Sequence, residues 1–191
     1  ESVDLSVMSN TNTYSNWING EPNEEGSVAE NYVHAQFGGS WGGGWNDNQD
    51  NSAYISIYEF DYITNDLQNS TFIGSFNGHS YFISNSSSSW TDSNDFISNY
   101  NGYLTIISSQ EETEFLESSI ASTAPGSYAW IGMYQDTSDP NYSEPDGGWK
   151  WVDGTYVQMS DVSEENNILW STSETTETIT VTPSETTEYW V

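Results

Sequence analysis

Oxygen-bearing side chains gather in the first 50 residues of the chain, on segments rich in glycine. Residues 21–25 (EPNEE) are followed by Glu30 and then by Asn46 and Asp47. Hard cations such as calcium take roughly six to eight oxygen ligands from carboxylates, amide carbonyls and water. Pro22 adds a constraint, because an X-Pro bond can be cis and a cis bond would aim the flanking side chains at one point. These residues are candidate cation ligands, although composition alone favours solvated acids in open loops.

The overall composition excludes several classes of partner. The 191 residues include 29 Asp and Glu against a single basic side chain, Lys150, for a formal net charge of −28. Without a basic patch to neutralise phosphate, we expect no binding to nucleic acid. No apolar run approaches the ~18 residues of a membrane span, so we expect no membrane insertion. Cys is absent, which excludes disulfides and thiolate metal sites, while 9 Trp, 13 Tyr and 7 Phe predict a folded aromatic core rather than disorder.

Local patterns predict the strands and helices that position these side chains. Residues 53–60 alternate as a strand. Residues 71–83 are again strand-like, with Asn77-Gly78 as a hairpin turn, and we expect the two segments to pair. A capping box at residues 108–112 opens a helix. The other expected elements are a helix capped by Ser89 or Thr91, and strands at residues 103–107, 128–133 and 149–152. The layout predicts an α+β fold with long irregular loops.

Motifs in two parts of the chain resemble the two halves of a C-type lectin-like domain. Residues 1–60 are similar to its second half, through the GEPN motif at 20–23 and the WND motif at 45–47. Residues 61–157 are similar to its first half, through GHSY at 78–81 and GWKWVDG at 148–154. The resemblance implies two helices, short antiparallel sheets and long loops. The halves are in reversed order, which leaves three interpretations open: a circular permutation, two consecutive partial domains, or a numbering that hides missing residues.

The resemblance also implies a calcium site that binds sugar. In this family the EPN and WND side chains hold one calcium ion and hydrogen-bond two vicinal sugar hydroxyls. The Glu-Pro-Asn motif at 21–23 resembles the motif of family members that bind mannose, glucose or N-acetylglucosamine. The spacing departs slightly from the family, with one extra residue before Glu30, and Tyr32 stands where a cysteine is common. The implied calcium ligands are Glu21, Asn23, Glu30, Asn46 and Asp47; the implied sugar-binding residues are Glu21, Asn23, Glu30, Asn46 and Trp41.

An acidic loop between residues 135 and 148 is a candidate for an accessory calcium site, which members of the family often carry. The alternative is a solvated loop. The candidate ligands are Glu24, Asp136, Asp139, Glu144 and Asp146. His34 and His79 are isolated in the sequence and no Ser-His-Asp order stands out, so we expect structural histidines and no enzyme.

Residues 158–191 differ in sequence pattern from the rest of the chain and contain SETTE twice, at 173–177 and 184–188. They resemble part of an Ig-like or PKD-like β-sandwich module of Bacteroidetes surface adhesins. Together the resemblances predict a calcium-dependent glycan-binding module of a secreted adhesin on a bacterial cell surface. The competing hypothesis is a structural unit of an extracellular fibre or filament, in which calcium only stabilises loops. In that case the partners would be copies of the chain or neighbouring domains.

Overall fold

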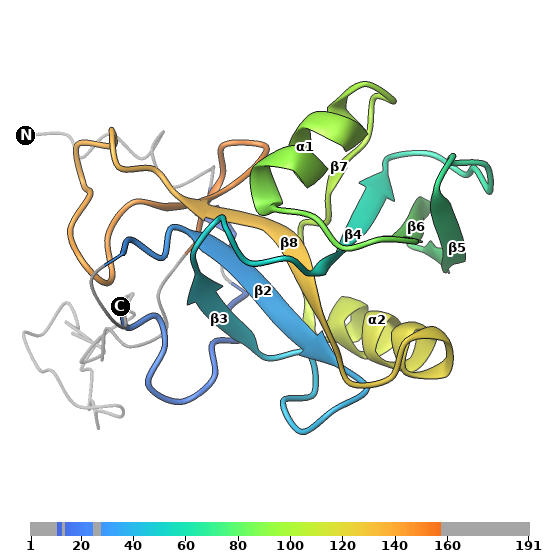
Figure 1. Cartoon of the computed structure of the whole chain (residues 1–191), viewed down its shortest axis with the longest axis horizontal. Coiled ribbons are helices and arrows are strands. Elements are labelled where there is room, and N and C mark those ends of the chain that lie inside the picture. Colours follow the sequence, from blue (N-terminus) through green and yellow to red (C-terminus); the bar gives the residue numbers. More distant parts are fainter. Residues whose placement is uncertain (1–10, 13, 25–27, 158–191) are drawn as a thin grey trace, which may run out of the picture. The chain divides into compact units, whose positions relative to one another are not determined.

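A computed structural model describes residues 11–12, 14–24 and 28–157, all of which fall within one compact unit. Strands run through its centre with a helix on either side (Figure 1). The expected β-sandwich piece at 158–191 lies outside the described residues. Within the described part, neither helix has the length and apolar character needed to cross a membrane.

The described residues form two helices and ten strands, in agreement with the expected α+β class. The strands are β1 (Thr11–Asn12), β2 (Tyr32–Phe37), β3 (Trp45–Asn48), β4 (Ile55–Phe60), β5 (Ser70–Phe76), β6 (His79–Ser84), β7 (Tyr103–Leu104), β8 (Ser127–Gln135), β9 (Trp149–Trp151) and β10 (Tyr156–Val157), and the helices are α1 (Trp90–Ser98) and α2 (Gln110–Thr123).

Strands from the two lectin-like segments pair with one another in one sheet. The sheet has the order β1-β10-β9-β8-β4-β6-β5, with β2 on β8, β3 on β2 and β7 on β4. In it β2 runs antiparallel to β8, with His34 opposite Trp130, and β4 runs antiparallel to β6, with Ile57 opposite Ile83. Residues 11–60 and 70–157 therefore share a single sheet.

The expected pairing of residues 53–60 with residues 71–83 is present, but through the second strand of the hairpin. Asn77 and Gly78 have φ of 48° and 90° and form the turn between β5 and β6. Two successive residues with positive φ are what a tight hairpin of this kind requires. After β4 the chain forms β5 at the edge of the sheet and then β6, which lies between β5 and β4.

Both helices begin at serine caps. The Ser89 side chain accepts from the backbone of Asp92 at the start of α1, and the Ser109 side chain accepts from the backbone of Glu112 at the start of α2. In the expected capping box the Glu112 carboxylate would accept from the backbone N–H of the capping residue, Ser109. It accepts instead from the backbone N–H and the hydroxyl of the preceding residue, Ser108. The strand expected over 103–107 is shorter and covers only β7.

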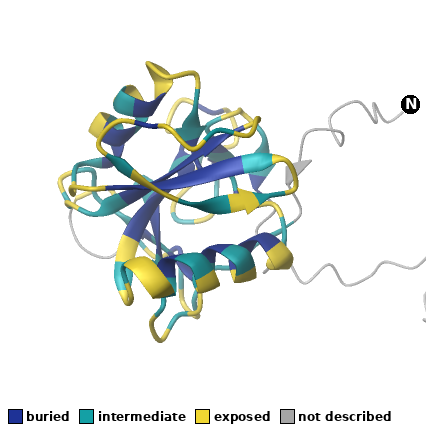
Figure 2. Ribbon diagram, turned by 90° about the vertical axis from the view of Figure 1, so that its right-hand side faces the viewer, coloured by how far each residue is buried: buried dark blue, intermediate teal, exposed yellow. Residues whose placement is uncertain are grey.

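Large aromatic side chains fill the space between the strands. Trp45 and Trp151 meet edge to face at 5.5 Å, and both are completely buried. Trp90 of α1 donates its indole N–H to the backbone oxygen of Ile131 in β8 at 2.7 Å, which fixes this helix to the sheet. Buried residues run along the central strands, while loops and the outer sides of the helices are exposed (Figure 2). Packing of aromatic rings thus takes the place of disulfides.

Candidate functional site

The loop of the EPN motif is tied to β3 through Asp47. The backbone N–H of Asn23 donates to the Asp47 carboxylate at 3.3 and 3.4 Å, and that of Glu24 donates at 3.2 Å. Asp47 is 2% exposed and lies on the inner side of β3, next to the buried Trp45. One buried carboxylate therefore joins the EPN loop to β3, the strand of the WND motif.

Glu21 and Asn23 lie side by side. The Asn23 amide donates to Glu21 Oε1 at 2.8 Å, and the peptide bond between Glu21 and Pro22 is cis. Asn23 is exposed and Glu21 is half-buried. Together they present an amide oxygen and a carboxylate next to each other at the surface, which is oxygen chemistry suited to calcium.

Glu30 comes just before β2 and is joined to the same loop. Its backbone N–H donates to Glu24 Oε2 at 3.1 Å. Beside it, Asn31 Oδ1 is buried and has no hydrogen-bond partner among the described residues. A buried oxygen without a donor costs free energy, and a cation would satisfy it. The donor set of this region therefore fits a hard cation, with Asn31 as an additional oxygen that the ligand assignment did not include.

Asn46 is oriented differently from the rest of the predicted set. Successive residues of a strand point to opposite faces, and Asn46 lies opposite His34 in the ladder whereas Asp47 lies opposite Val33. The hydrogen bonds above join Glu21, Asn23 and Asp47, but they do not reach Asn46. Within residues 11–12, 14–24 and 28–157, no group of three or more His, Cys, Asp or Glu is placed to hold a metal ion. An ion bound here would rely on Asn and backbone oxygens as well as on carboxylates.

Two of the candidate ligands of the accessory site are already paired with Lys150. The ammonium lies 2.9 Å from Asp136 and 2.5 Å from Asp139, and Tyr156 donates to Asp139 at 2.7 Å. The hydrogen bond from Lys150 holds the pKa of Asp139 well below its usual range, and the pKa of Lys150 is raised in turn. A second cation would have to compete with this lysine.

The remaining candidate ligands of the accessory site are divided between two loops. Glu144 accepts from Tyr142 and, at 3.2 Å, from Gln135, while Asp146 is exposed. Glu24 belongs to the loop of the EPN motif. The hydrogen bond to Glu144 raises the pKa of Tyr142, and the charge of Glu24 adds a smaller contribution, so the two acidic loops lie near each other.

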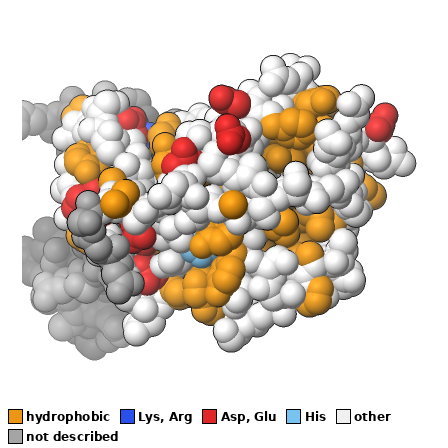
Figure 3. Space-filling view, in the orientation of Figure 1, with side chains coloured by type: hydrophobic (Ala, Val, Ile, Leu, Met, Phe, Trp, Pro, Cys, Tyr) orange, Lys and Arg blue, Asp and Glu red, His pale blue; other side chains and the backbone are white. Residues whose placement is uncertain are grey.

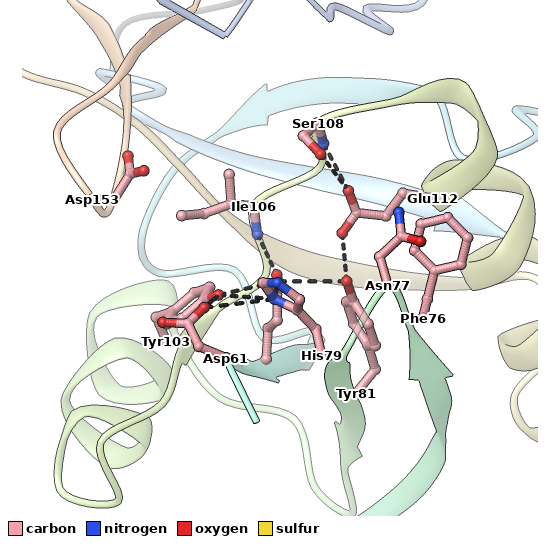
Figure 4. Close-up of a pocket in the computed structure, with 11 residues that line it drawn as sticks. Asp61, Phe76, Asn77, His79, Tyr81, Tyr103, Ile106, Ser108, Glu112 and Asp153 are labelled. Atoms are coloured by element: carbon pink, nitrogen blue, oxygen red, sulfur yellow. Dashed lines mark hydrogen bonds and ion pairs between the residues drawn. The ribbon is translucent and has the colours of Figure 1, made fainter. Parts of the chain in front are cut away.

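A pocket of about 290 Å³ lies at the C-terminal end of β4, beside Glu59 and Asp61, and was not anticipated from the sequence (Figure 4). Two of its acids, Glu59 and Glu112, are each 3% exposed. The Tyr81 hydroxyl lies between them, 2.7 Å from Glu112 and 3.4 Å from Glu59. His79 Nδ1 lies 2.7 Å from Glu59, so this histidine is not isolated as expected.

Burial and the nearby charge of Glu112 raise the pKa of Glu59. Thr105 and the backbone of Ile106 donate to its other oxygen at 2.8 and 3.0 Å and oppose that rise. Burial also raises the pKa of the Tyr81 and Tyr103 phenols, which keeps both protonated as hydrogen-bond donors. The pocket is a hydrogen-bonded network of acids and phenols. Its hydrogen bonds join positions far apart in the chain, 20 for His79 and Glu59 and 31 for Tyr81 and Glu112, so no local motif revealed it.

The paired strands, the two capped helices and the EPN loop held on β3 define a C-type lectin-like domain. The chain belongs to the C-type lectin domain family, whose model matches residues 86–191, more than half of its length. Domains of this family are generally calcium-dependent, non-enzymatic binders of carbohydrate. The EPN and WND motifs lie outside the matched range.

Animal proteins with C-type lectin domains are similar to part of the chain. The human C-type lectin domain family 10 member A is 35% identical over 75 residues, which is 39% of this chain and 20% of that protein. The C-type lectin domain family 4 member M of Hylobates lar is 38% identical over 85 residues, 44% of this chain and 19% of that protein. The CD209 antigen of Macaca mulatta is 35% identical over 98 residues, 49% of this chain and 22% of that protein. The chain thus spans about a fifth of the length of these relatives, and no solved structure matches it significantly.

Proposed function

We propose that the chain is a calcium-dependent glycan-binding module with a preference for mannose- or glucose-type sugars. The observation that carries this proposal is the Asp47 carboxylate, which accepts from the backbones of Asn23 and Glu24 and so joins the EPN loop to the WND strand. Membership of a family of generally calcium-dependent carbohydrate binders supports it.

In this proposal the side chains of the site have two roles: they hold the cation and they contact the sugar. Glu21, Asn23, Glu30, Asn46 and Asp47 would hold the cation, with Asn46 approaching from the face of β3 opposite to that of Asp47. The bound ion supplies positive charge and open coordination positions for two vicinal sugar hydroxyls. Glu21 and Glu30 accept hydrogen bonds from those hydroxyls, and the amides of Asn23 and Asn46 donate to them. Trp41 stacks on a sugar face.

We further propose that residues 1–60 and 61–157 form one circularly permuted domain. The pairing of β4 with β6 and of β2 with β8 supports this arrangement over two separate partial domains. The linker at 61–69 then joins the two strands that are the last and the first of an unpermuted domain.

We also propose an accessory calcium site in the acidic loop. Calcium binding there requires displacement of Lys150 from Asp136 and Asp139.

The biological setting that we propose is a secreted adhesin on a bacterial surface, with an Ig-like or PKD-like piece at 158–191. The structural alternative, in which calcium only stiffens the loops of a fibre subunit, is favoured by the burial of Asp47. The exposure of Asn23 favours the lectin. In either setting low pH should weaken the site, because protonated carboxylates release calcium.

Exchange of the EPN motif for a galactose-type motif tests the sugar preference. We expect the double variant Glu21→Gln with Asn23→Asp to lose binding to immobilised mannose and gain binding to galactose, both in the presence of calcium. Exchange of two exposed acids outside the site, Asp66→Asn with Asp95→Asn, is the control and should keep mannose binding. A double variant with unchanged sugar preference would refute the assignment of residues 21–23 as the sugar-contacting loop.

A further inference from the structure

Aromatic rings form an open platform on the outer face of β2 and β8. His34 lies at its centre, with the rings of Trp41, Tyr54 and Tyr128 at centroid distances of 5.7, 4.7 and 5.2 Å. Trp130 closes the cluster from below at 5.9 Å and is completely buried. Figure 3 shows hydrophobic side chains gathered around a histidine on this face, with acidic side chains beside them.

Strand register puts these rings on the same side of the sheet. His34 pairs with Trp130 and Gln36 with Tyr128, so their side chains share one face, while Val33 and Ala35 point into the core. Trp41 comes from the loop after β2 and packs against Tyr128 at 5.2 Å. Tyr128 is 37% exposed, so this platform is open to solvent rather than filled by the core.

The platform is uncharged in a chain whose net charge is −28. The four surrounding rings are uncharged Trp and Tyr side chains, and the imidazole at their centre is only 2% exposed. An anionic glycan would be repelled by the rest of the molecule. A neutral pyranose ring fits, because its C–H face packs on an aromatic face, which carries partial negative charge.

The platform is continuous with the candidate calcium site. Asn46 lies opposite His34 across the ladder, and Glu30 precedes His34 by four positions, which corresponds to about 13 Å at strand spacing. A chain of a few sugar units spans such a length, whereas one sugar ring cannot touch both places.

We propose that Trp41, Tyr54 and Tyr128 form a second sugar-ring subsite, so that the ring on which Trp41 stacks is a different one from the ring at the calcium loops, and that the ligand is a neutral oligosaccharide held at both places. The inference rests on the proposed function and extends it from one sugar to several. The platform would account for the outward orientation of Asn46, which would contact the part of the ligand between the two subsites.

Calorimetric titration of the calcium-loaded protein with methyl mannoside and with a neutral mannose-rich oligosaccharide tests this inference. We expect the wild-type protein to bind the oligosaccharide more tightly than the monosaccharide. Tyr128→Ala should weaken oligosaccharide binding about tenfold (~1.4 kcal/mol) and change monosaccharide binding by less than about twofold, because the monosaccharide binds only at the calcium loops. Tyr100→Ala is the matched control, because Tyr100 is 36% exposed and packs on a single ring, that of Phe96; it should change neither affinity.

The outcomes separate the inference from the function on which it rests. If both sugars bind in calcium with equal affinity and Tyr128→Ala changes neither, the platform is not a subsite while the lectin function stands. If Tyr128→Ala instead abolishes self-association of the protein in sedimentation without affecting sugar, the platform is an interface between copies and the inference fails. If no sugar binds, the inference and the proposed function fall together.

Discussion

The carboxylate of Asp47 on β3 accepts the backbone N–H of Asn23 through both of its oxygens, at 3.4 and 3.3 Å. Because Asp47 is buried and Asn23 is exposed, this contact links the interior of the domain to the tip of its EPN loop. The loop is therefore held by the fold itself in the described structure, and a bound cation would add to an arrangement that already exists.

The first prediction concerns this link. Asp47→Asn keeps the shape of the side chain but replaces one acceptor with an amide that cannot accept from the loop. We expect a loss of ~1–3 kcal/mol in unfolding free energy, as for an unsatisfied buried group, and a calcium affinity lowered ~10–100-fold. Denaturant unfolding and calcium titration measure the two effects. Asp66→Asn, which removes the same charge from an exposed position, should change neither; equal behaviour of the two variants would contradict the role of Asp47.

The second prediction concerns the pH dependence that Glu59 produces. Its pKa in the folded protein is raised by burial and by Glu112. A raised pKa means that the folded state binds more protons than the unfolded state. The stabilisation is therefore fully present below the unfolded pKa of about 4.3 and is lost as pH rises through the folded value.

Glu59→Gln removes this titration, so its unfolding free energy should depend less on pH than that of the wild type just above pH ~4.3. Denaturant unfolding at a series of pH values measures the slopes. Glu111→Gln, at an exposed position of α2, is the control and should keep the wild-type slope. Parallel curves for wild type and Glu59→Gln would show that Glu59 titrates normally.

The third prediction concerns Lys150, the single basic side chain of the sequence. Lys150→Met leaves Asp136 and Asp139 next to each other without a countercharge. We expect the melting temperature to fall by several degrees at neutral pH. The hydrogen bonds from Ser138 and then Lys150 lower the pKa of Asp136, and that from Lys150 lowers the pKa of Asp139, so the difference from wild type should shrink as pH falls below ~4 and the acids protonate. A difference that is independent of pH would indicate lost packing rather than a lost ion pair.

Local signals were sufficient for the elements that depend on neighbouring residues. The caps at Ser89 and Ser109 and the turn at Asn77-Gly78 follow from hydrogen bonds and backbone angles within a few positions, and the structure confirms all of them. The sequence allowed either form of the bond before Pro22, and the structure has the cis form. The reach of β7 was overestimated: Thr105 still donates its backbone N–H to Ile57 in β4, but Ile106 donates to the Glu59 carboxylate instead of to a strand.

Contacts between distant positions were beyond the reach of such signals. The network of Glu59, His79 and Glu112 joins three elements, and the sequence indicated no link between them, since His79 was expected to be isolated and Glu112 to serve a helix cap. The pairing of Lys150 with the acidic loop did have a signal, because one lysine among so many acids must find a carboxylate. That signal favours an ion pair over a calcium site at Asp136 and Asp139.

Calorimetric titration of the metal-free protein, first with calcium and then with a mannose-rich oligosaccharide, tests calcium-dependent glycan binding at residues 21–47. We expect heat from calcium binding, followed by heat from the sugar only after calcium has been added. Calcium binding with no subsequent sugar heat would support the structural alternative, in which the ion only stiffens loops. Absence of calcium binding would contradict the assignment of residues 21–47 as a cation site altogether.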